Sequence, residues 1–258
     1  MKLVTWNVNS LNVRLPRLLE WLAGNTPDVV CLQETKLEDA KFPVAALDEA
    51  GYASHYVGQK TYNGVAILAR HGLAVSDVAA GVEGLIDEQK RLISATVDGV
   101  RVISAYVPNG QSIDSDKYRY KLAWCDAVAK HLNAALKHHP ALAIAGDFNV
   151  APEDRDVHDP ALWVGQVLCS EPERAAFREF LAAGLVDSFR LFDQPPKTFS
   201  WWDYRMLAFP KNNGLRIDHI LLSPPLAARC TLSRIDRNAR KGEKPSDHAP
   251  AIVELRDA

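Results

Sequence analysis

Short apolar runs of six to eight residues recur along nearly the whole chain, and they limit its fold more than any other feature. Runs rich in Val, Ile and Leu that end at turn signals are typical of buried strands. The eight clearest are KLVTWNV, DVVCLQE, GVAILAR, RLISATV, VRVISAYV, ALAIAGD, IDHILL and APAIVEL, which begin at residues 2, 28, 64, 91, 100, 141, 217 and 249. A chain with so many short strands has to bury them in sheets.

Helical spacing of apolar residues is confined to a few segments between these runs. It occurs over residues 15–22, over 118–136 and over 177–181, and Pro140 stops the second of these patterns. A strand–helix–strand unit ending at Glu34 is echoed by a second one ending at Asp147. Two such units predict an α/β fold in which two sheets stack with helices outside, as one sandwich domain over residues 1–258. Neither a dinucleotide-binding fold nor a barrel is favoured.

Composition excludes several classes of protein. The net charge of −2 gives no global basic field, so any site for a polyanion is a local patch. The basic stretches 117–121 and 234–244 are candidates, although charge alone favours a solvated surface for both. The four cysteines lie far apart and read as reduced thiols of an intracellular protein. No segment has the ~20 apolar residues that span a bilayer, so a cytoplasmic protein with no membrane partner is expected.

Polar side chains gather where the predicted strands end. They are Asn7, Glu34, Tyr106, Asp147, Asn149, Asp218, Asp247 and His248. Each has an ordinary structural explanation: Asp147 and Asn149 suit a turn, Asp218 can pair with its neighbour Arg216, and a single histidine is usually structural. The recurrence of one arrangement at many strand ends favours a shared cleft lined by carboxylate and amide oxygens.

The chemistry of such a cleft follows from its donor atoms. Glu34, Asp147, Asp247 and the two amides Asn7 and Asn149 are hard oxygen ligands, with only one histidine nearby. That set suits Mg²⁺, with Mn²⁺ as the alternative, and does not suit zinc. Because Mg²⁺ usually binds through one or two carboxylates and a substrate phosphate, the sequence predicts a hydrolase of phosphate esters.

Six motifs together resemble one family. WNVN, LQETK, YVPNG, GDFN, LRIDHIL and PSDHAP occur in the order found in bacterial exonuclease III-type apurinic/apyrimidinic endonucleases, members of the exonuclease–endonuclease–phosphatase superfamily. The resemblance runs from Lys2 to about Leu255, and FSWWDYR at 199–205 resembles the DNA-repair branch. It implies a four-layer α/β sandwich of the DNase I-like type, with two mixed sheets face to face. It also implies Mg²⁺-dependent cleavage 5′ to abasic sites, with 3′→5′ exonuclease and 3′-end cleaning.

The resemblance also implies a role for each polar residue at the strand ends. The implied catalytic set is Tyr106, Asp147, Asn149, Asp218 and His248, and the implied metal set is Asn7, Glu34, Asp147, Asn149, Asp247 and His248. Glu34 would be the main metal ligand, and Asp147 would deprotonate or orient the attacking water. His248, oriented by Asp218, would contact the phosphate, and Tyr106 would donate to the phosphate or the leaving oxygen.

The implied partner is double-stranded DNA with abasic sites or blocked 3′ ends, bound by a monomer. An apolar pocket for a flipped-out sugar that lacks its base is implied at Trp201, Leu215 and Ile217. Extruding such a nucleotide from the duplex costs the least free energy. The candidate phosphate contacts are Arg91, Lys121 and Arg205. Segment 158–174 would line the DNA-facing side, where side chains vary with the preferred activity.

Two other functions are compatible with the same pattern. One is a phosphodiesterase for a small or lipid phosphate, against which FSWWDYR and the apolar pair Leu215 and Ile217 speak. The other is a non-catalytic DNA-binding protein on the same fold, which the presence of the complete polar set disfavours. Activity on soluble phosphate esters but not on DNA would distinguish the first from a DNA-repair enzyme.

Overall fold

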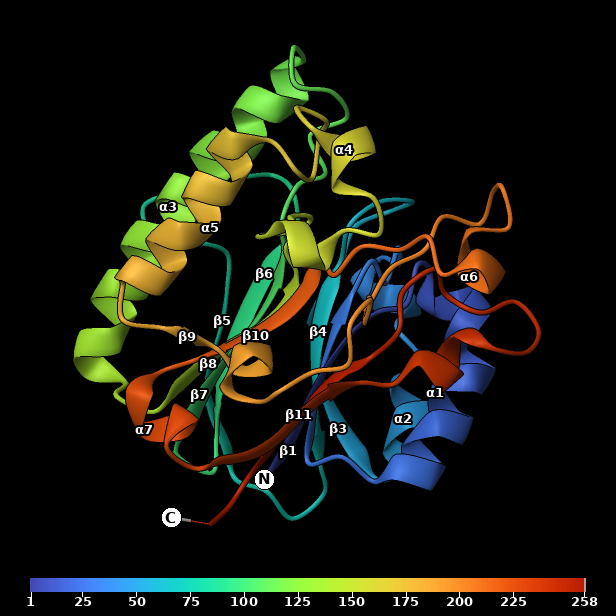
Figure 1. The fold of residues 1–258 in the computed structure, drawn as a ribbon. Coiled ribbons are helices and arrows are strands. Elements are labelled where there is room, and N and C mark those ends of the chain that lie inside the picture. The colour runs from blue at the N-terminus through green and yellow to red at the C-terminus, as the bar shows by residue number, and fades with distance from the viewer. Residues whose placement is uncertain (258) are drawn as a thin grey trace.

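Two six-stranded sheets form the centre of the computed structural model, which describes residues 1–257 (Figure 1). In spatial order, the first sheet consists of β11 (Cys230–Ile235), β12 (Ala251–Leu255), β1 (Lys2–Asn7), β2 (Val29–Gln33), β4 (Val65–Arg70) and β3 (Tyr52–Val57). The second consists of β5 (Val75–Ala80), β6 (Leu92–Val97), β7 (Val100–Tyr106), β8 (Leu142–Asp147), β10 (Asp218–Leu222) and β9 (Val186–Asp187).

Each sheet contains one parallel pair, and these pairs are the two repeated units of the sequence. β1 and β2 are parallel and flank helix α1, and β7 and β8 are parallel and flank helix α3. The other pairings are antiparallel, so both sheets are mixed. Because parallel strands need a crossover that packs on the sheet, each unit places its helix on an outer face.

The helices cover the outer faces of the sheets. The long ones are α1 (Leu11–Asn25), α3 (Asp116–His138) and α5 (Glu171–Ala182). The short ones are α2 (Val44–Glu49), α4 (Pro160–Trp163), α6 (Ala208–Lys211) and α7 (Pro224–Ala227), with 3₁₀ turns at Asp39–Lys41, Asp154–Asp156, Ser188–Leu191 and Arg237–Arg240. Ser170 and Glu173 form the capping box of α5 that their spacing predicts. No helix within residues 1–257 is long and apolar enough to cross a bilayer.

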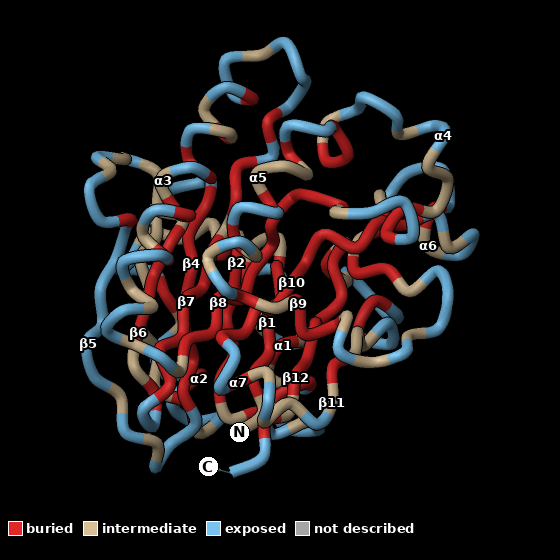
Figure 2. The backbone as a smooth tube through the Cα atoms, turned by 60° about the vertical axis from the view of Figure 1, so that its left-hand side comes forward, coloured by how far each residue is buried: buried red, intermediate tan, exposed pale blue. Residues whose placement is uncertain are grey.

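The packing confirms four layers. Side chains such as Val29, Val65 and Val102 form one apolar core between the two sheets. A second core lies between the first sheet and α1, and a third between the second sheet and helices α3 and α5. Figure 2 shows the central strands as the most buried part of the backbone, whereas the edge strand β5 is largely exposed. The structure therefore confirms the predicted sandwich of two mixed sheets with helices outside.

Strand register brings the polar strand ends together in the second sheet. Tyr106 of β7 is paired with Asp147 of β8, and Asp147 is paired with Asp218 of β10. Gly146 makes the close approach between β7 and β8 sterically feasible, because a Cβ there would lie 1.9 Å from the carbonyl oxygen of Ala105. The three polar groups therefore lie side by side at one edge of the sheet.

Candidate functional site

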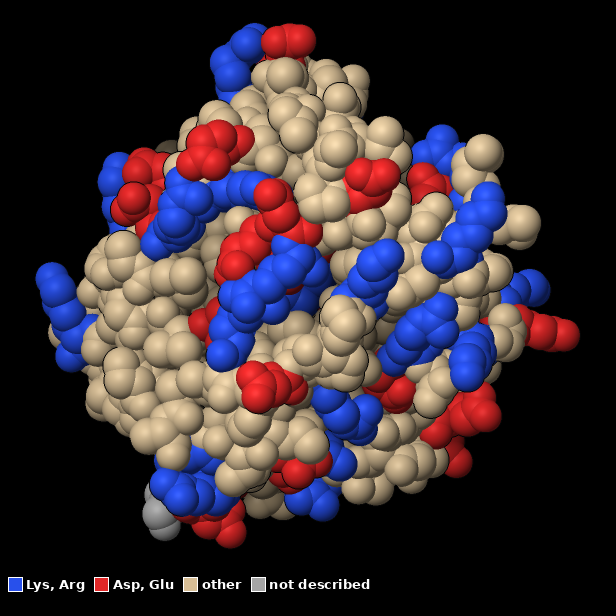
Figure 3. All heavy atoms as spheres, in the orientation of Figure 1, with Lys and Arg blue, Asp and Glu red and all other residues tan. Residues whose placement is uncertain are grey.

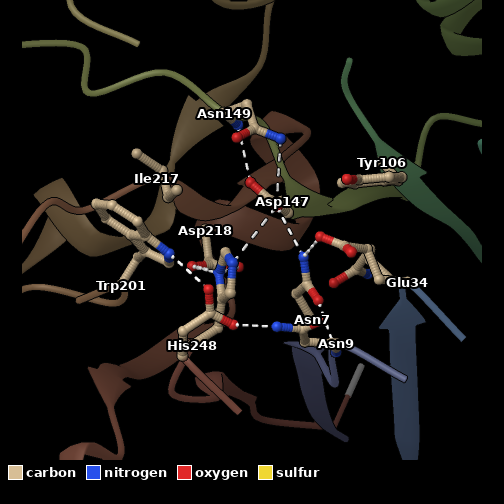
Figure 4. A network of polar contacts seen from close by, with 12 residues as sticks. Asn7, Asn9, Glu34, Tyr106, Asp147, Asn149, Trp201, Ile217, Asp218 and His248 are labelled. Atoms are coloured by element: carbon tan, nitrogen blue, oxygen red, sulfur yellow. Dashed lines mark hydrogen bonds and ion pairs between the residues drawn. The ribbon is translucent and has the colours of Figure 1, made fainter. Parts of the chain in front are cut away.

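Polar residues from five strand ends meet at one side of the stacked sheets (Figure 4). Residues of the loop before β12 join them there. Asn7 and Glu34 come from the ends of β1 and β2 in the first sheet. Tyr106, Asp147 and Asp218 come from β7, β8 and β10 in the second. The predicted shared cleft is thus built from both sheets, and residues distant in the sequence form it.

Asn7 connects the two sheets at this point. Its Nδ2 donates to Glu34 Oε1 at 2.8 Å and to Asp147 Oδ2 at 2.9 Å. Asn7 and Asp147 are 0% and 1% exposed, so the amide holds the Asp147 carboxylate where water has little access. A buried carboxylate is costly unless it is hydrogen-bonded or on a metal, and Asn7 meets part of that need.

Asn149 holds the Asp147 carboxylate from the other side. Its backbone N–H donates to Asp147 Oδ1 at 2.9 Å, and its Nδ2 donates to Asp147 Oδ2 at 3.3 Å and to the Val107 carbonyl at 2.9 Å. Asn149 has a φ of +50°, in the left-handed region that Asn tolerates well. The turn that explains these residues structurally is present, and the same turn also shapes the site.

His248 contacts two carboxylates from a loop before β12. Its Nδ1 lies 3.0 and 2.9 Å from the two oxygens of Asp218, and its Nε2 lies 3.7 Å from Asp147 Oδ2. Burial opposes the charged imidazolium, but the charges of Asp218 and Asp147 outweigh it and raise the pKa of His248 to about 10. Asp218 therefore does not pair with its neighbour Arg216, whose guanidinium contacts Asp156 and Asp187 instead.

Two further acids of the site have altered proton affinity. Burial raises the pKa of Asp147 to about 7, against the opposing charge of His248. Burial and the nearby carboxylates of Glu34 and Asp147 likewise raise the pKa of Tyr106 well above its ordinary value. A phenol held protonated is a hydrogen-bond donor, and a carboxylate whose pKa lies near neutrality is suited to exchange protons with water.

The donor set fits a divalent cation. One ligand atom each from Glu34, Asp147 and His248 lies within 4.8 Å of the other two. The oxygen atoms of this set suit Mg²⁺ or Mn²⁺ better than a softer metal. Asp247 lies outside that group: its oxygens accept from Asn9 Nδ2 at 2.9 Å and from Trp201 Nε1 at 3.0 Å.

Of the three cations predicted to contact DNA phosphates, one is placed where it cannot. Lys121 is 0% exposed, and its ammonium group lies 2.5 Å from Glu173 Oε1, so the expected phosphate contact is wrong for this residue. Arg91 is partly buried and lies over the ring of Tyr106, 4.7 Å from its centroid. Arg205 is exposed and pairs with Asp203, so both arginines remain accessible.

The three apolar residues predicted to line a sugar pocket are clustered. Leu215 and Ile217 are 0% and 1% exposed, whereas Trp201 is partly exposed and packs against them. Figure 4 shows the Trp201 ring beside Ile217. Of these three residues, Trp201 is therefore the one with solvent-exposed surface, and Leu215 and Ile217 pack behind it. Trp202, its neighbour in the chain, is fully buried and packs against Phe209.

Lys36, Asn9 and Asn109 belong to the site although the sequence analysis assigned them no role. The Lys36 ammonium group lies 2.8 Å from Glu34 Oε2 and donates to Asn9 Oδ1 at 2.6 Å. Asn109 Nδ2 donates to Asn149 Oδ1 at 3.2 Å. Each stands inside or beside a motif that the sequence analysis singled out. That position was the sequence feature from which its place in the site could have been predicted.

A cleft of about 690 Å³ opens beside these groups. Its lining includes Glu34 and Tyr106, and the cationic and amide groups of Lys36, Arg91, Asn109 and Lys117. Figure 3 shows that Lys and Arg side chains elsewhere are interspersed with Asp and Glu, and that several gather around α6. On the face that Figure 3 draws, positive charge therefore occurs in local groups, in agreement with a net charge of −2.

Comparison with known proteins agrees with this geometry. The family model described as Endonuclease/Exonuclease/phosphatase family matches residues 4–248, which span every strand end of the site. The chain belongs to this family. It is 35% identical to exodeoxyribonuclease III of Haemophilus influenzae, over 99% of this chain and 100% of that protein.

Solved structures extend the comparison to three dimensions. The 3′ phosphatase NExo from Neisseria, bound to a product DNA hairpin, superposes with a TM-score of 0.97 at 46% identity, over 99% of each chain. An AP endonuclease from Archaeoglobus fulgidus superposes with a TM-score of 0.95 at 39% identity, again over 99% of each chain. The chain is thus a nuclease of the exodeoxyribonuclease III and AP endonuclease type, a hydrolase of phosphodiester bonds in a metal-dependent family.

Proposed function

We propose that this protein is a Mg²⁺-dependent DNA-repair phosphodiesterase that incises duplex DNA 5′ to abasic sites and cleans blocked 3′ ends. The observation that carries the proposal is the buried Asp147 carboxylate, which accepts hydrogen bonds from Asn7 and Asn149 and lies beside His248. This arrangement provides a base, amide donors and a cation at one point, as hydrolysis of a phosphodiester requires. The 3′→5′ exonuclease, 3′-phosphatase and 3′-phosphodiesterase reactions use the same chemistry.

In this proposal Asp147 orients and deprotonates the attacking water, with Asn149 holding that water or a phosphate oxygen. His248, protonated because Asp218 and Asp147 stabilise its charge, donates to a phosphate oxygen where negative charge develops. Tyr106, protonated at neutral pH, donates to the phosphate or the leaving oxygen. Fixed donors of this kind need no reorganisation during the reaction.

Mg²⁺, or Mn²⁺ in its place, would be held by Glu34 with help from Asn7, Asp147 and Asn149. When bound, it would neutralise charge on the substrate phosphate. His248 belongs to the same group of ligand atoms, but its Nδ1 faces Asp218 and its Nε2 faces Asp147, so we assign it to the phosphate and not to the cation. Asp247 would influence the cation only indirectly, through its hydrogen bonds with Asn9 and Trp201.

The proposed substrate is double-stranded DNA, bound along the cleft beside Glu34 and Tyr106. Arg91 and Arg205 would contact phosphates, and the exposed edge of Trp201, backed by Leu215 and Ile217, would contact a sugar without its base. Few cations line the cleft, so the affinity for DNA should be modest and should fall with salt. We place the protein with the chromosome in the cytoplasm, acting as a monomer of one domain in base excision repair.

The test is a comparison of three duplexes incubated with the protein. One carries a single abasic-site analogue, one carries a 3′-phosphate, and one is intact; each is assayed with Mg²⁺ and with EDTA. Metal-dependent incision at the analogue supports the proposal, and the three rates rank the activities. If a folded sample cleaves none of the duplexes but hydrolyses a soluble phosphate ester, the assignment to DNA is replaced by one to small phosphate esters.

A further inference from the structure

A fully buried ion pair lies between helices α3 and α5, which run side by side on the outer face of the second sheet (Figure 1). Lys121 of α3 and Glu173 of α5 are both 0% exposed, and Lys121 Nζ lies 2.5 Å from Glu173 Oε1. An apolar pair of similar volume often stabilises a core at least as well as a buried ion pair does. Helix packing alone therefore gives no reason for these two charges.

The Lys121 ammonium group also joins the two loops that carry site residues. It donates to the Asn149 carbonyl at 2.7 Å, in the loop after β8, and to the Asn109 carbonyl at 3.1 Å, in the loop after β7. The two loops contact each other again through the side chains of Asn109 and Asn149. One buried cation thus fixes the backbone on which the Asn149 side chain is mounted.

Glu173 fixes the cation in turn, because both of its oxygens have additional partners. Oε1 accepts from the Leu168 N–H at 3.0 Å, and Oε2 accepts from the Ser170 N–H at 3.1 Å and from Ser170 Oγ at 2.6 Å. The contact with the Ser170 N–H belongs to the capping box at the first turn of α5, and the other two add to it. The carboxylate is therefore anchored to that turn and cannot follow a movement of the lysine.

The residue held by this pair has a left-handed backbone, as Glu34 of the same site also has. Asn149 has a φ of +50°, which Asn tolerates, and the contacts of its carbonyl and side chain fix where its N–H and side chain point. In that conformation its N–H and Nδ2 lie 2.9 and 3.3 Å from the Asp147 carboxylate. A shift of the Asn149 peptide would change both contacts together.

We propose that Lys121 is a positioning residue for the nuclease reaction: held by Glu173, it sets the Asn149 backbone so that Asn149 orients the Asp147 carboxylate. The inference rests on the proposed roles of Asn149 and Asp147 in water activation. Lys121 itself contacts no substrate, since it is fully buried. Its removal should therefore lower kcat and leave the binding of DNA unchanged.

The test uses the paired variant Lys121→Met, Glu173→Gln. Gln keeps one acceptor oxygen, which can accept from the Ser170 N–H and hydroxyl, while its amide nitrogen cannot replace the oxygen that accepts from the Leu168 N–H. Met fills the space of the lysine without donating to Asn149 or Asn109. The expected result is a folded protein whose kcat on its best duplex is at least tenfold lower, with KM within twofold of the parent. The matched control is Leu132→Ala, which weakens the packing of the same helix from a 0% exposed position in its core. It should lower Tm and leave kcat unchanged.

The outcomes separate this inference from the proposed function. A parent protein that cleaves no duplex contradicts the proposed function, whatever the variants do. A parent that cleaves, with a paired variant whose kcat stays within twofold, overturns the role of Lys121. Should the paired variant fail to fold, Glu173→Gln alone is measured: a fall in kcat at unchanged KM supports the role, and a parental kcat overturns it.

Discussion

His248 and Asp218 form a contact that, beside the one through Asn7, couples the two sheets at the site: the histidine Nδ1 lies 3.0 and 2.9 Å from the two carboxylate oxygens. Asp218 begins β10 of the second sheet, and His248 lies just before β12 of the first. Asp218 thereby fixes which imidazole nitrogen faces Asp147, and its charge favours the imidazolium. A carboxylate–imidazole pair of this kind makes the histidine a positioned donor.

Asp218→Asn should remove that charge and keep the shape of the side chain. We expect the pKa of His248 to fall and kcat on duplex DNA to drop by roughly 10²-fold, the scale of one positioned acid or base. NMR titration of the imidazole in the metal-free protein measures the first, and steady-state kinetics the second. Asp126→Asn is the control, because that carboxylate forms an exposed pair with Lys130, which has no assigned role. An unaltered kcat in Asp218→Asn would refute the assignment.

Glu34→Gln should weaken the binding of divalent cations. Gln keeps the shape of the side chain but loses the negative charge that a hard cation prefers. Loss of a residue that only supports a metal ligand lowers metal affinity by roughly tenfold, so loss of this ligand should lower the affinity for Mn²⁺ by at least that much. Titration calorimetry or Mn²⁺ paramagnetic resonance measures this directly. Glu38→Gln, at a partly exposed pair with Lys41, should leave affinity unchanged. Equal affinities in parent and Glu34→Gln would place the metal elsewhere.

His219 should make the stability of the protein depend on pH between about 6.5 and 4. Burial, followed by the charge of Arg216, lowers the pKa of His219 to about 4, whereas the unfolded chain titrates near 6.5. Below pH 6.5 the unfolded chain binds a proton that the folded one does not, so the contribution of His219 is lost as pH falls.

The variant His219→Gln isolates this contribution. Gln can accept from Arg216 and donate to the Val150 carbonyl, as the imidazole does, but it does not titrate. When the pH is lowered from 7 to 4.5, the free energy of unfolding of the parent should fall by about 2 kcal/mol more than that of the variant. Denaturant melts at both pH values give the difference, and a constant gap between the two proteins contradicts the prediction.

Two glycines should respond in opposite directions to an added methyl group. Gly146→Ala should destabilise by about 2 kcal/mol or more, because its Cβ would lie 1.9 Å from the Ala105 carbonyl oxygen and separate β7 from β8. Gly24→Ala, in helix α1 with open space around it, should stabilise by roughly 0.5–1 kcal/mol. Thermal melts of the two variants test both signs.

The eight strands predicted from the sequence are the eight that have a neighbour on each side, and the four edge strands were missed. Edge strands β3, β5, β9 and β11 are mostly half-buried or exposed and lack a continuous apolar run. Their pairing partner determines their conformation, so the local pattern is weak. The central strands are buried on both faces and carry the signal in their own residues.

The strand-end site was predictable for a different reason. Asp147 and Asn149 stand in step after an apolar run, and although a turn explains them singly, similar polar residues recur at several other strand ends. The ion pairs were not predictable, because their partners lie far apart in the chain: Lys121 and Glu173 are separated by 52 residues, and Arg216 and Asp156 by 60. Only the assembled fold shows that Lys121 is enclosed and cannot contact DNA.

The central claim is that the buried Asp147 carboxylate activates water for cleavage of DNA. Its most direct test compares Asp147→Asn with the parent on a duplex carrying one abasic-site analogue, measuring the single-turnover rate in Mg²⁺ and the Kd for the same duplex. The account predicts a rate lower by at least about 10²-fold with Kd within threefold. Cleavage by Asp147→Asn at the parental rate would contradict it.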